Sequence, residues 1–138
     1  MLGLILALGK VYGNIIISGI CSGYIEIIRG TPLLVQLFII YFGLPQIGVN
    51  LEPLVAALIG FTLNSGAYQA EYIRGSIQSI ESGQMIAARS LGMTKLKAIA
   101  NVILPQALRL SIPAWSNELI YLIKYTSIAY IILVRELT

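Results

Sequence analysis

Hydrophobic residues fill long stretches of this chain, and charged residues gather at the boundaries between them. Residues 30–51 and 53–70 contain no charged side chain, and residues 110–134 contain only Glu118 and Lys124. A transmembrane helix needs about 20 predominantly apolar residues. Each of these three stretches is therefore predicted to cross a membrane as one helix.

The N-terminal part follows a shorter apolar pattern. The run before Lys10 is too short to span a bilayer, and it lacks the basic start and small-residue cleavage site of a signal peptide. We interpret this run as the end of a span that begins before this sequence, and residues 11–28 as a helix. The prediction is a single all-α membrane domain over residues 1–138, incomplete at both ends, with three complete transmembrane helices and a partial N-terminal one.

Prolines and capping residues mark where helices begin and bend. Thr31 suits an N-cap, and Pro32 suits the first position of the helix that follows it. Glu52–Pro53 is a second start of this kind. Pro113 lies inside a helical pattern and should kink that helix.

A structured connection follows the second of the three predicted spans. Residues 75–105 contain two short helical patterns. Gly92 is placed to end the first pattern in the left-handed conformation, and Thr94 is placed to cap the second. Such a connection between spans indicates a partner that receives it.

The composition is that of an integral membrane protein. Hydrophobic residues make up 57% of the chain and charged residues 11%, and the mean hydropathy is +0.85, whereas a soluble domain of this size needs a more charged surface. The chain has one cysteine and neither histidine nor aspartate. We therefore predict no enzyme activity, no metal site and no cofactor. The net charge of +3 comes from basic residues that flank membrane segments, so we predict no nucleic-acid partner.

Basic residues also predict the orientation. Lys and Arg concentrate in cytoplasmic connections of membrane proteins. Residues 10–29 and 74–109 contain most of the basic residues, so both ranges are predicted to be cytoplasmic. The connection 45–53 contains none and is predicted to lie outside.

Two helical faces place polar side chains inside the predicted spans. Asn64, Ser65, Tyr68 and Glu71 share one face at 3.6 residues per turn. Polar groups in hydrocarbon usually face a bundle interior or a wet pathway. Asn64, Ser65 and Tyr68 are candidates for a translocation path, and hydrogen bonding between helices is an equally good interpretation for these three.

The second face lies in the last span. It combines Asn117, Tyr121 and Lys124, with Glu118 and Tyr125 beside it. Carboxylates and amides suit an ammonium group, and Lys124 suits a carboxylate. Together the two faces are predicted to form a path for a zwitterion, with the following candidate residues: Asn64, Ser65, Tyr68, Asn117, Tyr121 and Lys124.

The two glutamates of these faces have a second interpretation, which we favour. Glu71 and Glu118 would lie near the cytoplasmic interface and form salt bridges with Arg74 or Arg109.

The first helical pattern of the connection carries an apolar patch with a basic rim. Met85, Ala88 and Arg89 lie on one side of it, with Ile86 nearby. Such a helix docks in a groove of a partner or lies on the lipid surface. Because the connection has few basic residues and no aromatic anchor, we favour docking.

The stretch MIAARSLGMTKLKAIANVILPQAL resembles the cytoplasmic loop of binding-protein-dependent ABC importer permeases, whose pattern is Glu-Ala-Ala, three residues, Gly, nine residues and Ile-x-Leu-Pro. Ala87–Ala88, Gly92 and Leu104–Pro105 match at the required spacing. Ile86 stands at the Glu position and Val102 at the Ile position. The substitution at Ile86 alters a polar contact at the start of the loop helix and leaves its packing surface in place.

Three further stretches, residues 29–45, 63–80 and 117–132, resemble the polar amino acid uptake subfamily of these permeases. The resemblance implies the type I importer fold in a prokaryotic cell membrane, with the chain crossing it several times among the lipids. It also implies a second permease copy or paralogue, two ATP-binding ABC subunits that hydrolyse ATP, and an extracytoplasmic amino-acid-binding protein.

The resemblance further implies that the first loop helix is the coupling helix. Its predicted contacts with an ATP-binding subunit are made by Met85, Ile86, Ala87, Ala88, Arg89, Leu91 and Gly92.

Two functions follow from the sequence. The leading one is the permease subunit of an ATP-driven amino acid importer, which forms the translocation path and couples it to the ATPase subunits. Since permeases of this family usually have about five spans, the chain is interpreted as an internal fragment or a truncated product. The alternative function is therefore a truncated, non-transporting membrane protein that only packs with other helices.

Overall fold

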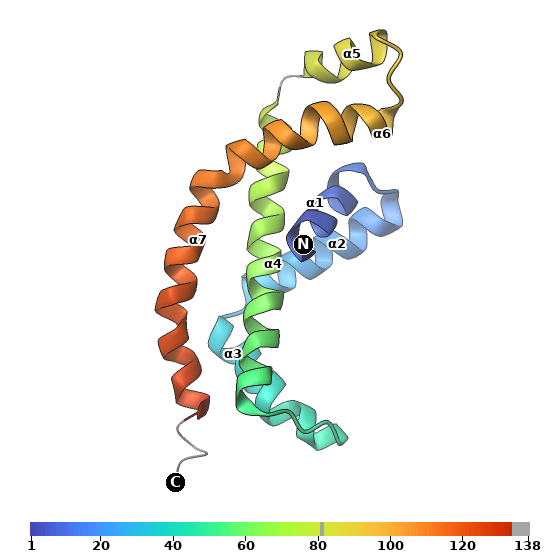
Figure 1. Ribbon diagram of the computed structural model, residues 1–138. Coiled ribbons are helices and arrows are strands. Elements are labelled where there is room, and N and C mark those ends of the chain that lie inside the picture. Colours follow the sequence, from blue (N-terminus) through green and yellow to red (C-terminus); the bar gives the residue numbers. More distant parts are fainter. Residues whose placement is uncertain (81, 134–138) are drawn as a thin grey trace.

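The computed structural model describes the backbone of residues 1–80 and 82–133, and the side chains of residues 1–80 and 82–127. Every regular element in these ranges is helical (Figure 1). The α-helices are α1 (Leu2–Tyr12), α2 (Ile15–Gly30), α3 (Leu33–Phe38), α4 (Pro53–Ser79), α5 (Ser82–Ser90), α6 (Lys95–Ala98) and α7 (Leu104–Leu133). Two π-helical segments, η1 (Ile39–Gly43) and η3 (Ile99–Ile103), and one 3-10 segment, η2 (Leu44–Ile47), join them.

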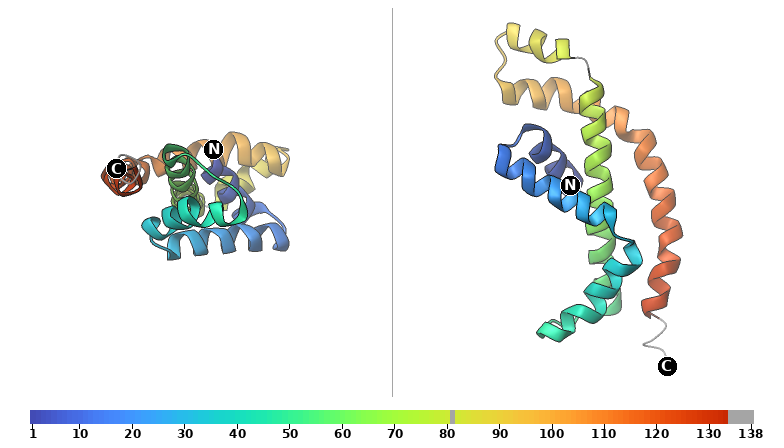
Figure 2. Two further views of the ribbon diagram at one scale, coloured as in Figure 1. Left: turned by 90° about the horizontal axis from the view of Figure 1, so that it is seen from below. Right: turned by 180° about the vertical axis from the view of Figure 1, so that it is seen from behind.

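Helix α4 is the central element. Its 27 residues extend over about 40 Å at 1.5 Å per residue. The views in Figures 1 and 2 place α7 along one side of α4 and the pair α1–α2 on the other. As predicted, α4 begins directly after Glu52, with Pro53 in its first turn; this position tolerates proline because its backbone N–H has no partner within the helix.

Helices α1 and α2 form a hairpin. The chain turns at Gly13 and Asn14, and the Asn14 side chain caps α2 by accepting a hydrogen bond of 2.8 Å from the Ile17 backbone N–H. The predicted helix over residues 11–28 is therefore wrong at its start. Asparagine in front of an apolar run is a frequent N-cap, and this signal was present in the sequence.

A sharp break separates α2 from α3. Helix α2 and the segment Leu33–Ile47 are bent by 103° with respect to each other. The prediction that Thr31 caps the second segment is wrong, because its hydroxyl donates backwards to the Ile27 carbonyl oxygen at 2.9 Å. Pro32 is the N-cap residue and lies outside the helix.

In the part of the chain that the structure describes, no single helix is both long and apolar enough to cross a membrane, whereas α2 and Leu33–Ile47 meet this criterion together as a bent pair. The three complete transmembrane helices predicted from the sequence are therefore not confirmed. The range 30–51 starts at the Thr31–Pro32 break, and after Phe38 it continues as the π-helical segment η1 and the 3-10 segment η2, which ends at Ile47. Helices α4 and α7 are long enough, but polar side chains lower the hydropathy of both.

The connection after α4 follows the predicted pattern. Helix α5 ends at Gly92, whose φ of 81° lies in the left-handed region. The Gly92 N–H bonds the Arg89 carbonyl oxygen and the Met93 N–H bonds that of Ala88, which is the Schellman arrangement. Thr94 caps α6 by accepting from the Lys97 N–H at 3.4 Å. Both predicted caps are confirmed.

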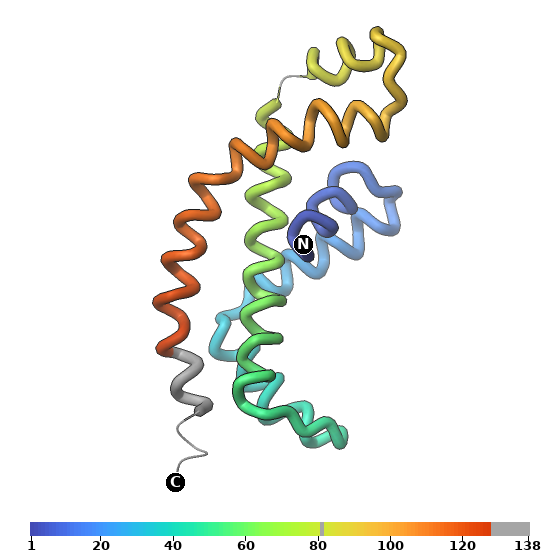
Figure 3. Tube along the Cα trace, in the orientation of Figure 1, coloured from blue at the N-terminus to red at the C-terminus, as the bar shows by residue number. Residues whose placement is uncertain are grey.

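Helices α6, η3 and α7 form one continuous run. Figure 3 traces this run from its passage across the end of α4 to its course alongside α4. Pro113 lies inside α7, as predicted, and proline removes one hydrogen bond of the helix and favours a bend there.

Small and β-branched side chains fill the contact between the helices. Ala7, Ala70 and Ala107 are completely buried, and Ile25 and Ile73 almost completely. Alanine and glycine allow close approach of helix backbones without polar atoms. This packing holds α1, α2 and α7 around α4 and fixes the walls of the site described next.

Candidate functional site

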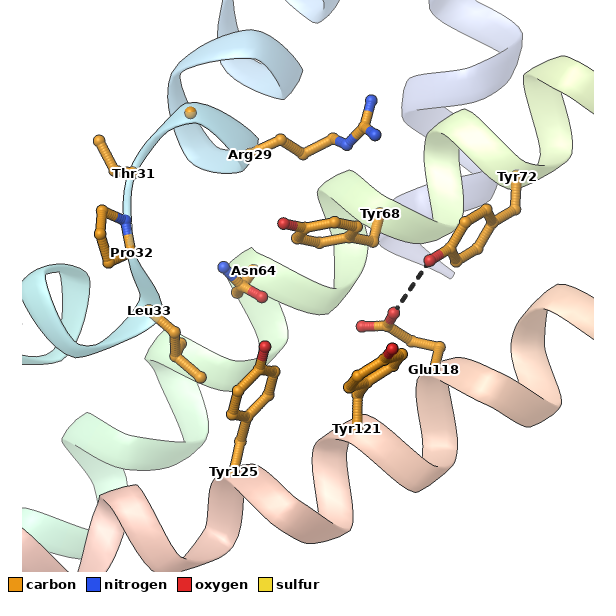
Figure 4. A pocket seen from close by; sticks show the side chains of 11 residues that line it. Arg29, Thr31, Pro32, Leu33, Asn64, Tyr68, Tyr72, Glu118, Tyr121 and Tyr125 are labelled. Atoms are coloured by element: carbon orange, nitrogen blue, oxygen red, sulfur yellow. Dashed lines mark hydrogen bonds between the residues drawn. The ribbon is translucent and has the colours of Figure 1, made fainter.

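A cavity of about 580 Å³ lies between the α2–α3 break, α4 and α7 (Figure 4). Its walls come from three distant parts of the sequence. The lining residues are Arg29, Gly30, Thr31, Pro32, Leu33, Asn64, Tyr68, Tyr72, Glu118, Tyr121 and Tyr125.

Arg29 supplies the positive charge of this cavity. The carbon of its guanidinium group lies 5.2 Å from the centre of the Tyr68 ring, close enough for a cation–π interaction. Its Nη1 is 3.7 Å from Glu71 Oε2, a long ion pair, and 41% of its side chain is exposed. The guanidinium group therefore keeps donors available on the cavity side.

Glu71 is engaged mainly by two other cations. Lys10 donates to Glu71 Oε1 at 2.8 Å, and the Arg74 guanidinium donates to both carboxylate oxygens at 2.8–3.0 Å. The predicted salt bridge between Glu71 and Arg74 is confirmed. The Lys10 contact, which the sequence did not indicate, ties the end of α1 to α4.

Glu118 supplies the negative charge. Only 6% of it is exposed, and one of its carboxylate oxygens accepts a hydrogen bond of 3.2 Å from the Tyr72 hydroxyl. Within the described residues it forms no salt bridge, so the favoured interpretation as a partner of Arg74 or Arg109 is wrong for Glu118. Helix α7 instead turns this carboxylate towards the cavity (Figure 4).

Four tyrosines complete the polar surface. Tyr68 and Tyr72 extend from α4, while Tyr121 and Tyr125 extend from α7. The rings of Tyr121 and Tyr125 are stacked, with their centroids 6.3 Å apart. Asn64, Tyr68 and Tyr72 follow one another at a spacing of four residues, which places them along one face of α4. The cavity thus has aromatic walls with opposite charges at separate places.

The structure divides the predicted path residues into two groups. Asn64, Tyr68 and Tyr121 line the cavity. Ser65 lies towards a second hollow near α1, where its hydroxyl accepts from Gln69.

The other two predicted path residues, Asn117 and Lys124, are exposed and are not among the residues that line the cavity. The Lys124 ammonium lies 5.7 Å from the centre of the Tyr121 ring.

Sequence reasoning missed several lining residues. Arg29 was interpreted only as a charge at the end of a span, and Tyr72 was not considered. The regular spacing from Asn64 to Tyr72 was a usable signal for the tyrosine. Nothing in the sequence indicated that Arg29 and Glu118 face one cavity, because this depends on the α2–α3 break.

The α5 loop presents a different surface from the predicted one. Ala88 is 4% exposed, and Met85 packs on the main hydrophobic core. Ile86 and Leu91 are 65% and 82% exposed. The patch predicted around Met85 and Ala88 therefore faces the protein itself, and Ile86 and Leu91 supply the apolar surface that remains open.

Comparison with known proteins places this architecture in a family. All residues, 1–138, match the model of the binding-protein-dependent transport system inner membrane component. The chain belongs to this family of inner membrane components of transport systems.

Several relatives are known by name. The chain is 50% identical over 137 residues to the L-cystine transport system permease protein TcyB of Bacillus subtilis, covering 99% of this chain and 58% of TcyB. It is 40% identical over 140 residues to the glutamine transport system permease protein GlnP of Escherichia coli, covering 100% of this chain and 64% of GlnP. The chain thus spans about three fifths of the length of the curated relatives it matches.

A solved structure shares the fold. A crystal structure of an amino acid ABC transporter with histidines matches with a TM-score of 0.86 and 47% sequence identity, over 95% of this chain and 61% of that one. The helical arrangement described above is therefore shared with a chain of that amino acid ABC transporter.

Proposed function

We propose that this chain is the permease subunit of an ATP-driven amino acid importer and that its cavity receives the amino acid during passage. One observation carries the proposal: Arg29 and Glu118 stand at separate places on the wall of one cavity. The arrangement suits a zwitterion whose carboxylate meets Arg29 and whose ammonium meets Glu118.

The burial of Glu118 supports this assignment. A carboxylate out of contact with water is costly unless a cation or hydrogen bonds compensate for it. The Tyr72 hydroxyl supplies one hydrogen bond. A substrate ammonium would supply the missing charge, and the faces of the neighbouring tyrosine rings favour a cation in the same place.

The size of the cavity fits the substrate class. About 580 Å³ lies within the range of about 300–1,000 Å³ for small-molecule sites. The names of the two relatives described above refer to cystine and glutamine. Because these side chains differ while the groups on the α-carbon are shared, we propose amino acids as the class.

The partners follow from the exposed loop. Ile86 and Leu91 on α5, and Leu96 on α6, are exposed apolar side chains, which suit the groove of a soluble protein. We propose that ATP-binding ABC subunits dock there, through the exposed residues among those predicted for the loop: Ile86, Ala87, Arg89, Leu91 and Gly92.

Further partners complete the proposed assembly. They are an extracytoplasmic amino-acid-binding protein and a second permease copy or paralogue. We also propose that the chain is a multi-pass protein of a prokaryotic cell membrane with the loop 75–105 in the cytoplasm, as the distribution of basic residues favours.

The test is uptake of a labelled amino-acid panel that includes L-cystine and L-glutamine, in cells that carry the assembled transporter. Glu118→Gln keeps the size of the side chain and removes its charge, and it should lower uptake at least tenfold while the ATP-binding subunits still co-purify. Glu26→Gln, an exposed glutamate on α2, is the matched control and should transport normally. Absence of uptake of every amino acid by the unaltered transporter, or normal uptake by Glu118→Gln, would refute the proposal.

A further inference from the structure

The break between α2 and α3 forms part of the cavity wall, although it is not a regular element. Its residues Arg29–Leu33 line the cavity. Pro32 has no backbone N–H, and helix α2 ends at Gly30, so the last carbonyl groups of α2 lack helical partners. Something else must satisfy these groups if the wall is to keep one shape.

Gln36 supplies the missing donors. From α3 its side-chain Nε2 reaches back to the Ile28 carbonyl oxygen at 2.7 Å, the Thr31 carbonyl oxygen at 3.0 Å and the Thr31 hydroxyl oxygen at 2.9 Å. Thr31 in turn donates to the Ile27 carbonyl oxygen. The end of α2 and the break itself are thereby hydrogen-bonded to the same amide group.

The other end of the same amide reaches the central helix. Gln36 Oε1 accepts a hydrogen bond of 3.1 Å from Asn64 Nδ2. Gln36 is 8% exposed and Asn64 is 5% exposed. Because Asn64 lines the cavity and Gln36 does not, Gln36 connects the break to the cavity from behind.

We propose that Gln36 is a positioning residue that fixes the segment Arg29–Thr31 against Asn64 and so sets the place of the Arg29 guanidinium in the cavity. The proposal rests on the function proposed above in so far as it concerns the substrate. The fixed geometry of the break stands independently of the substrate. A side chain at position 36 that fills the same volume without hydrogen-bond donors would leave the cavity in place. The segment Arg29–Thr31 in its wall would then vary in position.

Burial and chemistry favour this role over simple packing. A buried amide without partners is costly, and a glutamine that served only to fill space would be replaced by an apolar side chain without loss. Here the amide nitrogen and the amide oxygen are both engaged, on three separate parts of the chain: α2, the break and α4. The Gln36 amide thus joins all three parts through one side chain, beside the Tyr24 hydrogen bond and the long Arg29 ion pair that also link α2 to α4.

The first experiment measures the geometry without any substrate. Spin labels are attached to Gly30→Cys and Ser79→Cys in the assembled transporter, in a Cys21→Ala background. A side chain at Gly30 meets open space, and Ser79 lies about 22 Å along α4 from the level of Asn64. Double electron–electron resonance should give one narrow distance distribution, and Gln36→Met should at least double its width.

The second experiment measures ligand binding. Kd values of purified, assembled transporter for labelled L-glutamine and L-cystine are compared before and after Gln36→Met. The substitution should raise Kd at least fivefold for whichever amino acid binds, while the basal ATPase rate stays within twofold. Gln106→Met is the matched control, because within the described residues the Gln106 amide bonds only the Val102 carbonyl of its own helical run. The control should change neither Kd nor the distance distribution.

Gln36→Glu is the second variant in case the methionine variant does not assemble. Its carboxylate still accepts a hydrogen bond from Asn64 but has no proton to donate to the carbonyl groups of Ile28 and Thr31. Gln36→Glu should therefore broaden the distance distribution as Gln36→Met does. An unchanged distribution in both variants, or an unchanged Kd beside a broadened distribution, would overturn the positioning role. If the unaltered transporter binds no amino acid, the proposed function fails, and the distance measurement still decides whether Gln36 fixes the break.

Discussion

Replacing Glu71 tests whether its ion pair with Lys10 holds α1 on α4. Glu71→Gln keeps the side-chain volume and removes the negative charge that pairs with the Lys10 ammonium at 2.8 Å. Arg74 lies one turn away on the same helix, so its contact with Glu71 does not hold α4 to another helix. The Lys10 contact joins residues 61 positions apart in the sequence. Of all the helices, α1 should therefore lose the most protection against hydrogen exchange when this contact is weakened.

The magnitude follows from the burial of the pair. Removing one partner of a fully buried ion pair costs about 3–5 kcal/mol, whereas exposed pairs contribute about 0.2–1 kcal/mol. The Lys10 and Glu71 side chains are 20% and 13% exposed, which places this pair between these limits, at about 2 kcal/mol. At about 1.36 kcal/mol for each factor of ten, the amides of α1 should exchange with deuterium about 30-fold faster.

The assay is hydrogen–deuterium exchange of the assembled transporter, read out by mass spectrometry on peptides from α1. Glu26→Gln is the control for loss of a negative charge, because Glu26 is exposed on α2. Exchange of α1 peptides within twofold of the unaltered protein after Glu71→Gln would refute the argument. So would an equal acceleration in the Glu26 variant, because the effect would then come from net charge and not from the ion pair.

Three further predictions concern the loop and the last helix. Gly92→Val should reduce the stimulation of ATPase activity by loaded binding protein several-fold, because a β-branched residue resists a φ of 81° by about 1–2 kcal/mol; Gly92→Asn should retain most of it, and equal stimulation in the two variants would contradict this reasoning. Lys124→Met should lower amino acid uptake while the ATP-binding subunits still co-purify, because the Lys124 ammonium lies beside the cavity-lining ring of Tyr121. Unchanged uptake would mean that Lys124 only extends to the membrane interface. With Cys21 removed, a cysteine at Ser90 should stay unlabelled by an impermeant reagent outside intact cells, and one at Gly48 should react; labelling of the former would reverse the predicted orientation.

Several local features of the fold were predictable from the sequence, although the predicted Thr31 cap was wrong and the Asn14 cap was not predicted. The start of α4 at Pro53, the left-handed Gly92 and the Thr94 cap each depend on one residue and its immediate neighbours. Proline, glycine and threonine have strong positional preferences at helix ends. Each of these three features could therefore be predicted from a few neighbouring residues, and the structure confirms all three.

The assembled features were not predictable in the same way. Periodicity shows which residues share a face of one helix, as for Asn64 and Tyr68, but it does not show which helices meet. Arg29 enters the cavity because the chain bends by 103° after α2, and Glu118 enters it because α7 packs beside α4. Gln36 was overlooked for the same reason, since its partners lie on three different segments.

The walls of the cavity also determine when it can form during synthesis. Its three sides come from residues 29–33, 64–72 and 118–125, and proteins are made from the N-terminus onwards. Asn64, Tyr68 and Tyr72 leave the ribosome before the helix that encloses them exists. Glu118, Tyr121 and Tyr125 are the last lining residues to be made, after Tyr72, the hydrogen-bond partner of Glu118 on α4. A nascent chain stalled before Glu118 would contain Arg29 but not the carboxylate that faces it, so the cavity cannot be complete until this part of α7 has been made.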